Sequence, residues 1–152
     1  MKYIIDSNVL FSAFISGRDV YHLLFSEYTI YLPDYAFLEI EKYKTRILGK
    51  TKLTEPEFKE FVIALLRNVT VVPSLLLSQS SLQKAYYLCQ SIDEKDTVYV
   101  ATSIEFGFPL ITTDKKLYDG LKEYGLAQVI LLEDVIKQLR SLNDIESDLS
   151  EN

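Results

Sequence analysis

The chain has one cysteine, one histidine and no tryptophan among its 152 residues, and these shortages exclude several kinds of chemistry. Cys89 has no second cysteine to pair with, so an intrachain disulfide and a thiolate zinc site are both excluded. The single histidine, His22, excludes an imidazole acid–base pair. The five glycines are scattered, and no glycine-rich phosphate loop is present. We therefore expect a cytoplasmic protein in which Cys89 is a small buried residue.

Long hydrophobic runs are also missing. No apolar run is long enough to cross a bilayer, and the segment Met1–Asp6 becomes charged too soon for a signal peptide. The composition, with 48% apolar and 25% charged residues, is ordinary for one folded domain. We expect that domain over residues 1–142. Residues 143–152 carry four acidic groups and few apolar ones, so we expect a frayed acidic tail there.

The charge balance is acidic, with a formal net charge of −6. This argues against a protein that grips nucleic acid through bulk positive charge. It does not argue against an enzyme that acts on nucleic acid, because bound divalent cations reverse the local charge of an acidic pocket.

Strand and helix patterns alternate along the whole chain. β-prone apolar runs predict strands at residues 2–5, 28–32, 69–72, 110–112 and 128–131. Helical patterns predict helices at residues 9–16, 20–27, 35–48, 55–68, 80–91, 94–106, 115–124 and 133–142. This alternation predicts an α/β fold with a mostly parallel sheet covered on both faces, and ligands bind such sheets at the carboxyl ends of the strands.

Acidic residues occur at the ends of two predicted strands and on two predicted helices. Asp6 and Asp114 each follow a predicted strand, Glu39 lies at the edge of an apolar helical stripe, and Asp93 and Asp96 open a helix. Each also has a simpler interpretation. The three aspartates at residues 6, 93 and 114 suit helix N-caps, and Glu39 could form an ion pair with a lysine such as Lys42. Together, however, the acids favour one shared site.

Clustered carboxylates are unfavourable unless a cation lies among them. Oxygen ligands without His or Cys favour Mg²⁺ or Mn²⁺, and the matching chemistry is phosphodiester hydrolysis. We expect Asp6, Asp96 and Asp114 to bind the metal, and Glu39 to bind it or to orient the attacking water. The hydroxyls of Thr112 and Thr113 are expected to hold a carboxylate or a metal-bound water.

The same residues resemble the motifs of PIN-domain nucleases, many of which are ribonuclease toxins of toxin–antitoxin pairs. The resemblance covers about residues 1–131, and it rests on residues 4–8 (Ile-Ile-Asp-Ser-Asn), Glu39, residues 93–101 and residues 108–114. It implies a three-layer α/β/α sandwich and Mg²⁺- or Mn²⁺-dependent cleavage of single-stranded RNA. It also implies that Asp6, Glu39, Asp96 and Asp114 form the acidic quartet, with Asp93 as an additional acid and Asn8 as a supporting residue. A homodimer and an inhibitory antitoxin are the implied partners.

Three other functions use parts of the same pattern. An inactive PIN-like module would bind RNA or protein without cutting. A haloacid-dehalogenase-like phosphatase would need an aspartate where Asn8 stands, and a receiver domain would need an acceptor Asp where Pro73 and Ser74 follow a strand. Lys115 and Lys116 are candidates for guiding RNA because they adjoin Asp114, although a solvated charged face is the simpler interpretation of each taken alone.

Overall fold

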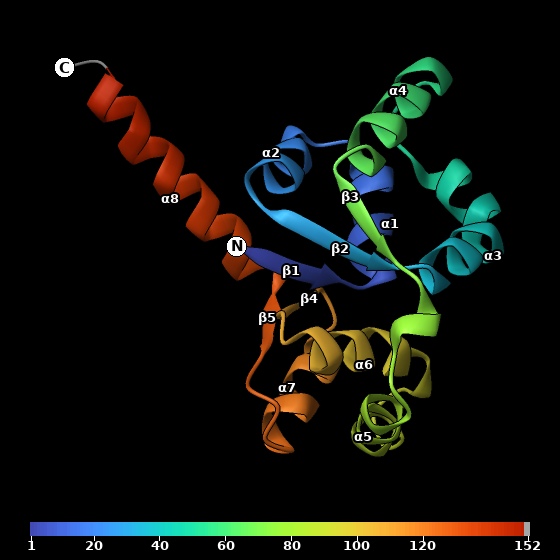
Figure 1. The fold of residues 1–152 in the computed structure, drawn as a ribbon. Helices are drawn as coiled ribbons and strands as arrows, with labels where there is room; N and C mark the ends of the chain where they lie inside the picture. The colour runs from blue at the N-terminus through green and yellow to red at the C-terminus, as the bar shows by residue number, and fades with distance from the viewer. Residues whose placement is uncertain (151–152) are drawn as a thin grey trace.

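The computed structural model describes residues 1–150, and its centre is a five-stranded parallel sheet (Figure 1). The strands are β1 (Lys2–Ile5), β2 (Thr29–Pro33), β3 (Val69–Val72), β4 (Leu110–Thr112) and β5 (Val129–Leu131). Their order in the sheet is β3-β2-β1-β4-β5, and every neighbouring pair is parallel. The chain therefore starts in the middle, builds one side, and then crosses β1 to build the other side. The reversal between β1 and β4 is the switch point at which α/β folds of this kind bind ligands.

Helices cover both faces of this sheet, as expected for a three-layer α/β/α sandwich (Figure 1). One layer contains α1 (Ser7–Ser16), α2 (Asp19–Glu27), α3 (Tyr35–Lys50), α4 (Glu55–Leu66) and α8 (Leu132–Ser150). The other contains α5 (Gln79–Cys89), α6 (Thr97–Phe106) and α7 (Lys115–Glu123). Two short 3₁₀ helices, η1 (Ser74–Leu76) and η2 (Glu94–Asp96), precede α5 and α6.

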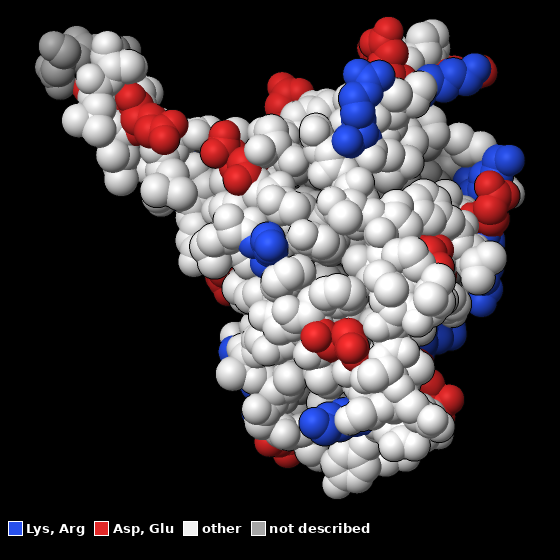
Figure 2. Space-filling view, in the orientation of Figure 1, with Lys and Arg blue, Asp and Glu red and all other residues white. Residues whose placement is uncertain are grey.

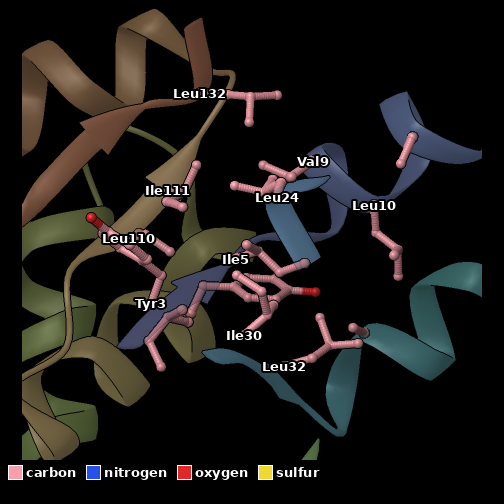
Figure 3. Close-up of a cluster of buried hydrophobic side chains, with 14 of the residues drawn as sticks. Tyr3, Ile5, Val9, Leu10, Leu24, Ile30, Leu32, Leu110, Ile111 and Leu132 are labelled. Atoms are coloured by element: carbon pink, nitrogen blue, oxygen red, sulfur yellow. The ribbon is translucent and has the colours of Figure 1, made fainter. Parts of the chain in front are cut away.

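The core lies between the sheet and these helices. Ile4, Ile5, Leu110 and Ile111 on the two central strands have no exposed surface, because a parallel sheet is buried on both faces. Figure 3 shows residues from β1, β2, β4, α1, α2 and α8 packed in one cluster. Full burial of one Leu or Ile side chain contributes roughly 1.5–3 kcal/mol. The ends of β1 and β4 are therefore held firmly side by side.

Several local predictions are confirmed. Thr54 and Glu57 form a reciprocal capping box at the start of α4. Gly107 ends α6 in the left-handed conformation, with φ of +69°, which a glycine adopts without steric cost. Cys89 is completely buried. No helix within residues 1–150 is long and apolar enough to span a membrane.

The ends of β2 and α3 differ in detail from the predicted ranges. Asp34 precedes the helix but makes no capping hydrogen bond. Its Oδ2 instead accepts a hydrogen bond from the Ser74 N–H at 3.1 Å, which ties the end of β2 to the turn after β3. Pro33 does not end β2 early, since it is paired with Val72 in the register of β2 and β3. Gly49 lies inside α3 rather than beyond it, because the helix continues to Lys50 on an exposed surface.

The last helix is longer than the sequence predicted. Helix α8 continues to Ser150 instead of ending at residue 142, and residues 151–152 lie outside the described range. The reason is the helical spacing of Leu142, Ile145 and Leu149, which extends the stripe begun by Val135 and Leu139. Figure 1 shows that this part of α8 projects away from the body, and the three later residues are exposed.

The surface agrees with the acidic composition. Figure 2 shows scattered charges of both signs on the face that it presents, without a continuous basic area. Binding of nucleic acid through bulk positive charge is therefore not supported by this face.

Candidate active site

Asp6 and Asp114 lie on the two sides of the switch point. Strands β1 and β4 are neighbours, with Ile5 in register with Ile111, so the residues that follow the two strands emerge at one edge of the sheet. Each aspartate also caps a helix. Asp6 Oδ1 accepts the Val9 N–H at 3.0 Å, and Asp114 Oδ1 accepts the Leu117 N–H at 3.1 Å. The capping role and the ligand role are compatible, because capping uses only one carboxylate oxygen.

Thr112 connects these two aspartates. Its hydroxyl donates a hydrogen bond to Asp6 Oδ2 at 2.5 Å and accepts one from the Asp114 N–H at 3.0 Å. Thr112 has no exposed surface, and Asp6 is only 1% exposed. The bond joins residues 106 positions apart in the sequence. Thr112 therefore fixes the orientation of Asp6 relative to the backbone of Asp114.

Asp96 closes η2 and stands immediately before α6. It is 9% exposed, yet within residues 1–150 its carboxylate accepts no hydrogen bond and makes no helix cap. Asp93 is exposed, and its Oδ1 accepts the Lys95 N–H at 3.0 Å. Helix capping therefore accounts for the position of Asp93 but not for that of Asp96. A carboxylate at this depth without protein donors depends on a proton, a cation or the solvent that still reaches it.

Glu39 reaches the same region from α3. Its Oε1 accepts a hydrogen bond from the Tyr99 hydroxyl at 2.5 Å, and Tyr99 is 1% exposed. The alternative ion pair with Lys42 is absent from the described structure, where the Lys42 ammonium lies 5.4 Å from the centre of the Tyr43 ring. Glu41, two residues along the helix, is exposed. Glu39 is therefore held toward the sheet by a neutral donor rather than neutralised by a lysine.

Electrostatics link all five acids. Burial raises the pKa of Asp6 to about 6, against the lowering effect of its hydrogen bonds, and the charges of Asp114 and Glu39 raise it further. Burial raises the pKa of Asp96 to about 7, and the charges of the acids at residues 6, 93, 114 and 39 add to this effect. Carboxylates that perturb one another in this way lie in one shared field.

No cation of the protein balances this charge. Within residues 1–150, none of the five acids forms a salt bridge with Lys or Arg. In the same range, no group of three or more His, Cys, Asp and Glu side chains is placed to hold a metal ion as a ready-made cage. A full cage is not required for Mg²⁺, which keeps several waters and is usually bound through one or two carboxylates. The donor set is all oxygen, and two of its members, Asp6 and Asp96, are nearly buried, so it suits a hard dication.

The other predicted residues lie at the margin of the cluster. Asn8 is exposed in the first turn of α1, and Thr113, Lys115 and Lys116 are exposed around the start of α7. His22 packs its ring edge against Phe61, with ring centres 4.7 Å apart. His22 is therefore a half-buried packing residue in this structure.

Sequence analysis missed two residues of the site, Tyr99 and Ser7. The Tyr99 hydroxyl hydrogen-bonds Glu39, and the Ser7 side chain partly offsets the rise in the pKa of that hydroxyl, so Tyr99 lies between the start of α1 and α3. The sequence signal for Tyr99 was a tyrosine in a mostly apolar stretch. It stands three residues after Asp96, which is about one helical turn. A tyrosine hydroxyl buried at that place needs a polar partner.

The comparisons with known proteins agree with this geometry. The family model described as PIN domain matches residues 4–146, and the chain therefore belongs to the PIN-domain family. A search of curated proteins found no match.

Three solved structures share the fold at low sequence identity. PAE2754 from Pyrobaculum aerophilum has a TM-score of 0.65 and 12% identity, over 93% of this chain and 96% of its own. VapBC2 from Rickettsia felis, bound to a promoter DNA fragment, has a TM-score of 0.58 and 16% identity, over 86% of this chain and 98% of its own. A toxin–antitoxin complex from Klebsiella pneumoniae has a TM-score of 0.56 and 17% identity, over 84% of this chain and 95% of its own.

Proposed function

We propose that this protein is a divalent-metal-dependent endoribonuclease that hydrolyses phosphodiester bonds of single-stranded RNA. The observation that carries the proposal is the meeting of Asp6, Asp96 and Asp114 in one electrostatic field without a neutralising Lys or Arg. Such a cluster costs free energy in the absence of a cation, so a binding function for it is the simplest physical reason for its existence.

The metal is Mg²⁺ or Mn²⁺ in this proposal. Asp6, Asp96 and Asp114 hold it directly or through its bound waters, with Asp93 at the exposed margin. When bound, such an ion lowers the pKa of water and polarises phosphoryl oxygens. The protein groups prepare the site for it. Thr112 fixes the Asp6 carboxylate through the 2.5 Å hydrogen bond, and the buried Asp96 carboxylate has no internal donor that competes for its oxygens.

Glu39 has a different role from the aspartates in this scheme. One of its oxygens is occupied by the Tyr99 hydroxyl, which leaves the other free to accept a proton from a water molecule and to orient it toward phosphorus. Its position at the margin of the core, only partly exposed, allows contact with both solvent and substrate.

We further infer that the protein acts as the toxin of a toxin–antitoxin pair and binds a protein antitoxin. The support is that two structures with this fold are described as VapBC2 and as a toxin–antitoxin complex. A homodimer is part of the same proposal. The exposed side chains of Leu142, Ile145 and Leu149 offer apolar surface that association could bury.

The test is cleavage of a labelled single-stranded RNA with Mn²⁺, with Mg²⁺ and with EDTA. Asp96→Asn removes one charge from the cluster, and Glu41→Gln, on the exposed side of α3, is the matched control. The proposal expects cleavage that requires the metal and is lost in Asp96→Asn alone. Equal cleavage by both variants would reject the site, and absence of cleavage by the wild-type protein would favour a PIN-like binding module.

A further inference from the structure

A cavity of about 320 Å³ opens beside the acidic cluster, at the carboxyl ends of β4 and β5. Its size falls at the lower end of the roughly 300–1,000 Å³ typical of ligand sites. Thr112 forms part of the cavity, and its hydroxyl is the one bound to Asp6. Thr112 therefore takes part in both the cavity and the proposed cleavage site, and the cavity has room for one small unit of a larger ligand.

The two sides of the cavity differ in chemistry. Thr113 and Lys115, both exposed, come from the connection between β4 and α7. Leu132 and Ile136 come from the first turns of α8 and give the opposite side an apolar surface, with the carboxylate of Glu133 between them in sequence. Lys115 and Glu133 do not form an ion pair with each other within the described residues. Both charged groups are therefore free to contact a ligand.

We propose that this cavity binds the nucleotide of the RNA strand next to the cleaved phosphodiester, an inference that rests on the proposed nuclease function. The base lies against Leu132 and Ile136, while the Lys115 ammonium contacts the flanking phosphate. Glu133 then faces the base rather than the phosphate, because two anions would repel each other.

The carboxylate of Glu133 also gives the cavity a preference among bases. A carboxylate accepts a hydrogen bond from an exocyclic amino group, such as N4 of cytosine. Uracil carries a carbonyl at that place and offers no such donor. The cavity therefore favours cytidine, and other bases with amino groups, over uridine.

The test measures RNA binding rather than cleavage, with Ca²⁺ as the divalent cation. Fluorescence anisotropy follows labelled oligocytidylate and oligouridylate of equal length, with RNA integrity checked on a gel. Lys115→Ala is expected to weaken binding of both by about tenfold, the loss of one charge-assisted hydrogen bond. Lys137→Ala is the matched control, since Lys137 is exposed on α8 but does not line the cavity. Glu133→Ala is expected to erase a preference for cytidylate of about fivefold or more.

The outcomes separate this proposal from the nuclease function. Two results would reject the nucleotide site and leave the nuclease proposal intact, provided that the RNA is cut normally. One is equal RNA binding by the two lysine variants. The other is equal binding of cytidylate and uridylate by the wild-type protein. If no RNA is cut but the binding pattern is as described, the nucleotide site stands and the catalytic proposal fails.

Discussion

The hydroxyl of Tyr99, on α6, donates a 2.5 Å hydrogen bond to Glu39, on α3, across 60 positions of sequence. It holds a glutamate toward a cluster of aspartates that would otherwise repel it. Because Tyr99 is buried and neutral, it positions the carboxylate without cancelling its charge. Burial raises the pKa of Tyr99, and the Glu39 interaction raises it further, so this hydroxyl remains a donor throughout the physiological range.

Tyr99→Phe should therefore weaken catalysis without unfolding the protein. The ring is kept, and so is its edge contact with Tyr35, whose ring centre lies 6.3 Å away. We expect kcat to fall by roughly 10- to 100-fold, the loss typical when a group that orients a site residue is removed, with KM little changed. Steady-state cleavage kinetics measure both parameters. Tyr35→Phe is the control, and an equal effect of the two substitutions would argue against a positioning role for Tyr99.

Thr112→Val should destabilise the protein by about 1–3 kcal/mol, because it leaves the buried Asp6 oxygen and the Asp114 N–H without their partner. Thr112→Ser keeps the hydroxyl and should cost much less, since only one methyl group is lost. Urea unfolding of the metal-free protein at neutral pH compares the two. A Thr112→Val variant as stable as the wild-type protein would show that the hydroxyl contributes nothing.

The pKa values predict how stability depends on pH. Asp6 and Asp96 have folded-state pKa values of about 6 and about 7, above the 3.8 of an ordinary aspartate. Between about pH 4 and pH 7 the folded state binds more protons than the unfolded state, so the contribution of these groups to stability falls as the pH rises. This contribution to stability is lost once Asp6 and Asp96 are both ionised in the folded state.

Asp96→Asn should accordingly raise the melting temperature of the metal-free protein at pH 8, by about 5 °C. The amide removes the like-charge repulsion among the acids. At pH 4 to 5, where Asp96 is protonated, the variant and the wild-type protein should differ little. Thermal melts in EDTA at the two pH values test this. A variant less stable than the wild-type protein at pH 8 would contradict the raised pKa.

Mn²⁺ should stabilise the wild-type protein more at pH 8 than at pH 5, because at the lower pH the ion competes with protons for Asp6 and Asp96. Differential scanning fluorimetry with and without Mn²⁺ measures the shift. Glu41→Gln should behave like the wild-type protein, because Glu41 lies on the exposed surface of α3. A shift that is independent of pH would place the ion elsewhere.

The sequence predicted the fold class and the positions of the strand-end acids, because the apolar runs before Asp6 and before Thr113 are short, β-prone and followed at once by polar residues. It also predicted that the hydroxyl of Thr112 could hold a carboxylate, as it does, but not that this carboxylate would be the one of Asp6. The partnership of Thr112 with Asp6 depends on β1 and β4 being neighbours, which local pattern does not encode. Tyr99 was overlooked for a similar reason, since its role appears only when α3 and α6 are placed together.

Errors at element ends have equally physical causes. Asp34 looked like a helix cap, but a hydrogen bond to the backbone of Ser74 uses its carboxylate instead. The segment after Leu142 looked like a frayed tail because its charges are all acidic, yet the spacing of its apolar residues continues the helix to Ser150. In this segment the acidic composition indicated a frayed tail, whereas the spacing of the apolar residues indicated a helix. The structure has the helix up to Ser150.

The central claim, that Asp6, Asp96 and Asp114 jointly hold a divalent ion, is tested most directly by calorimetric titration of the metal-free protein with Mn²⁺ at pH 8. The account predicts saturable binding that Asp96→Asn weakens by more than about 100-fold, while Glu41→Gln leaves it unchanged. Binding of equal strength in all three proteins, or no binding to the wild-type protein, would contradict it.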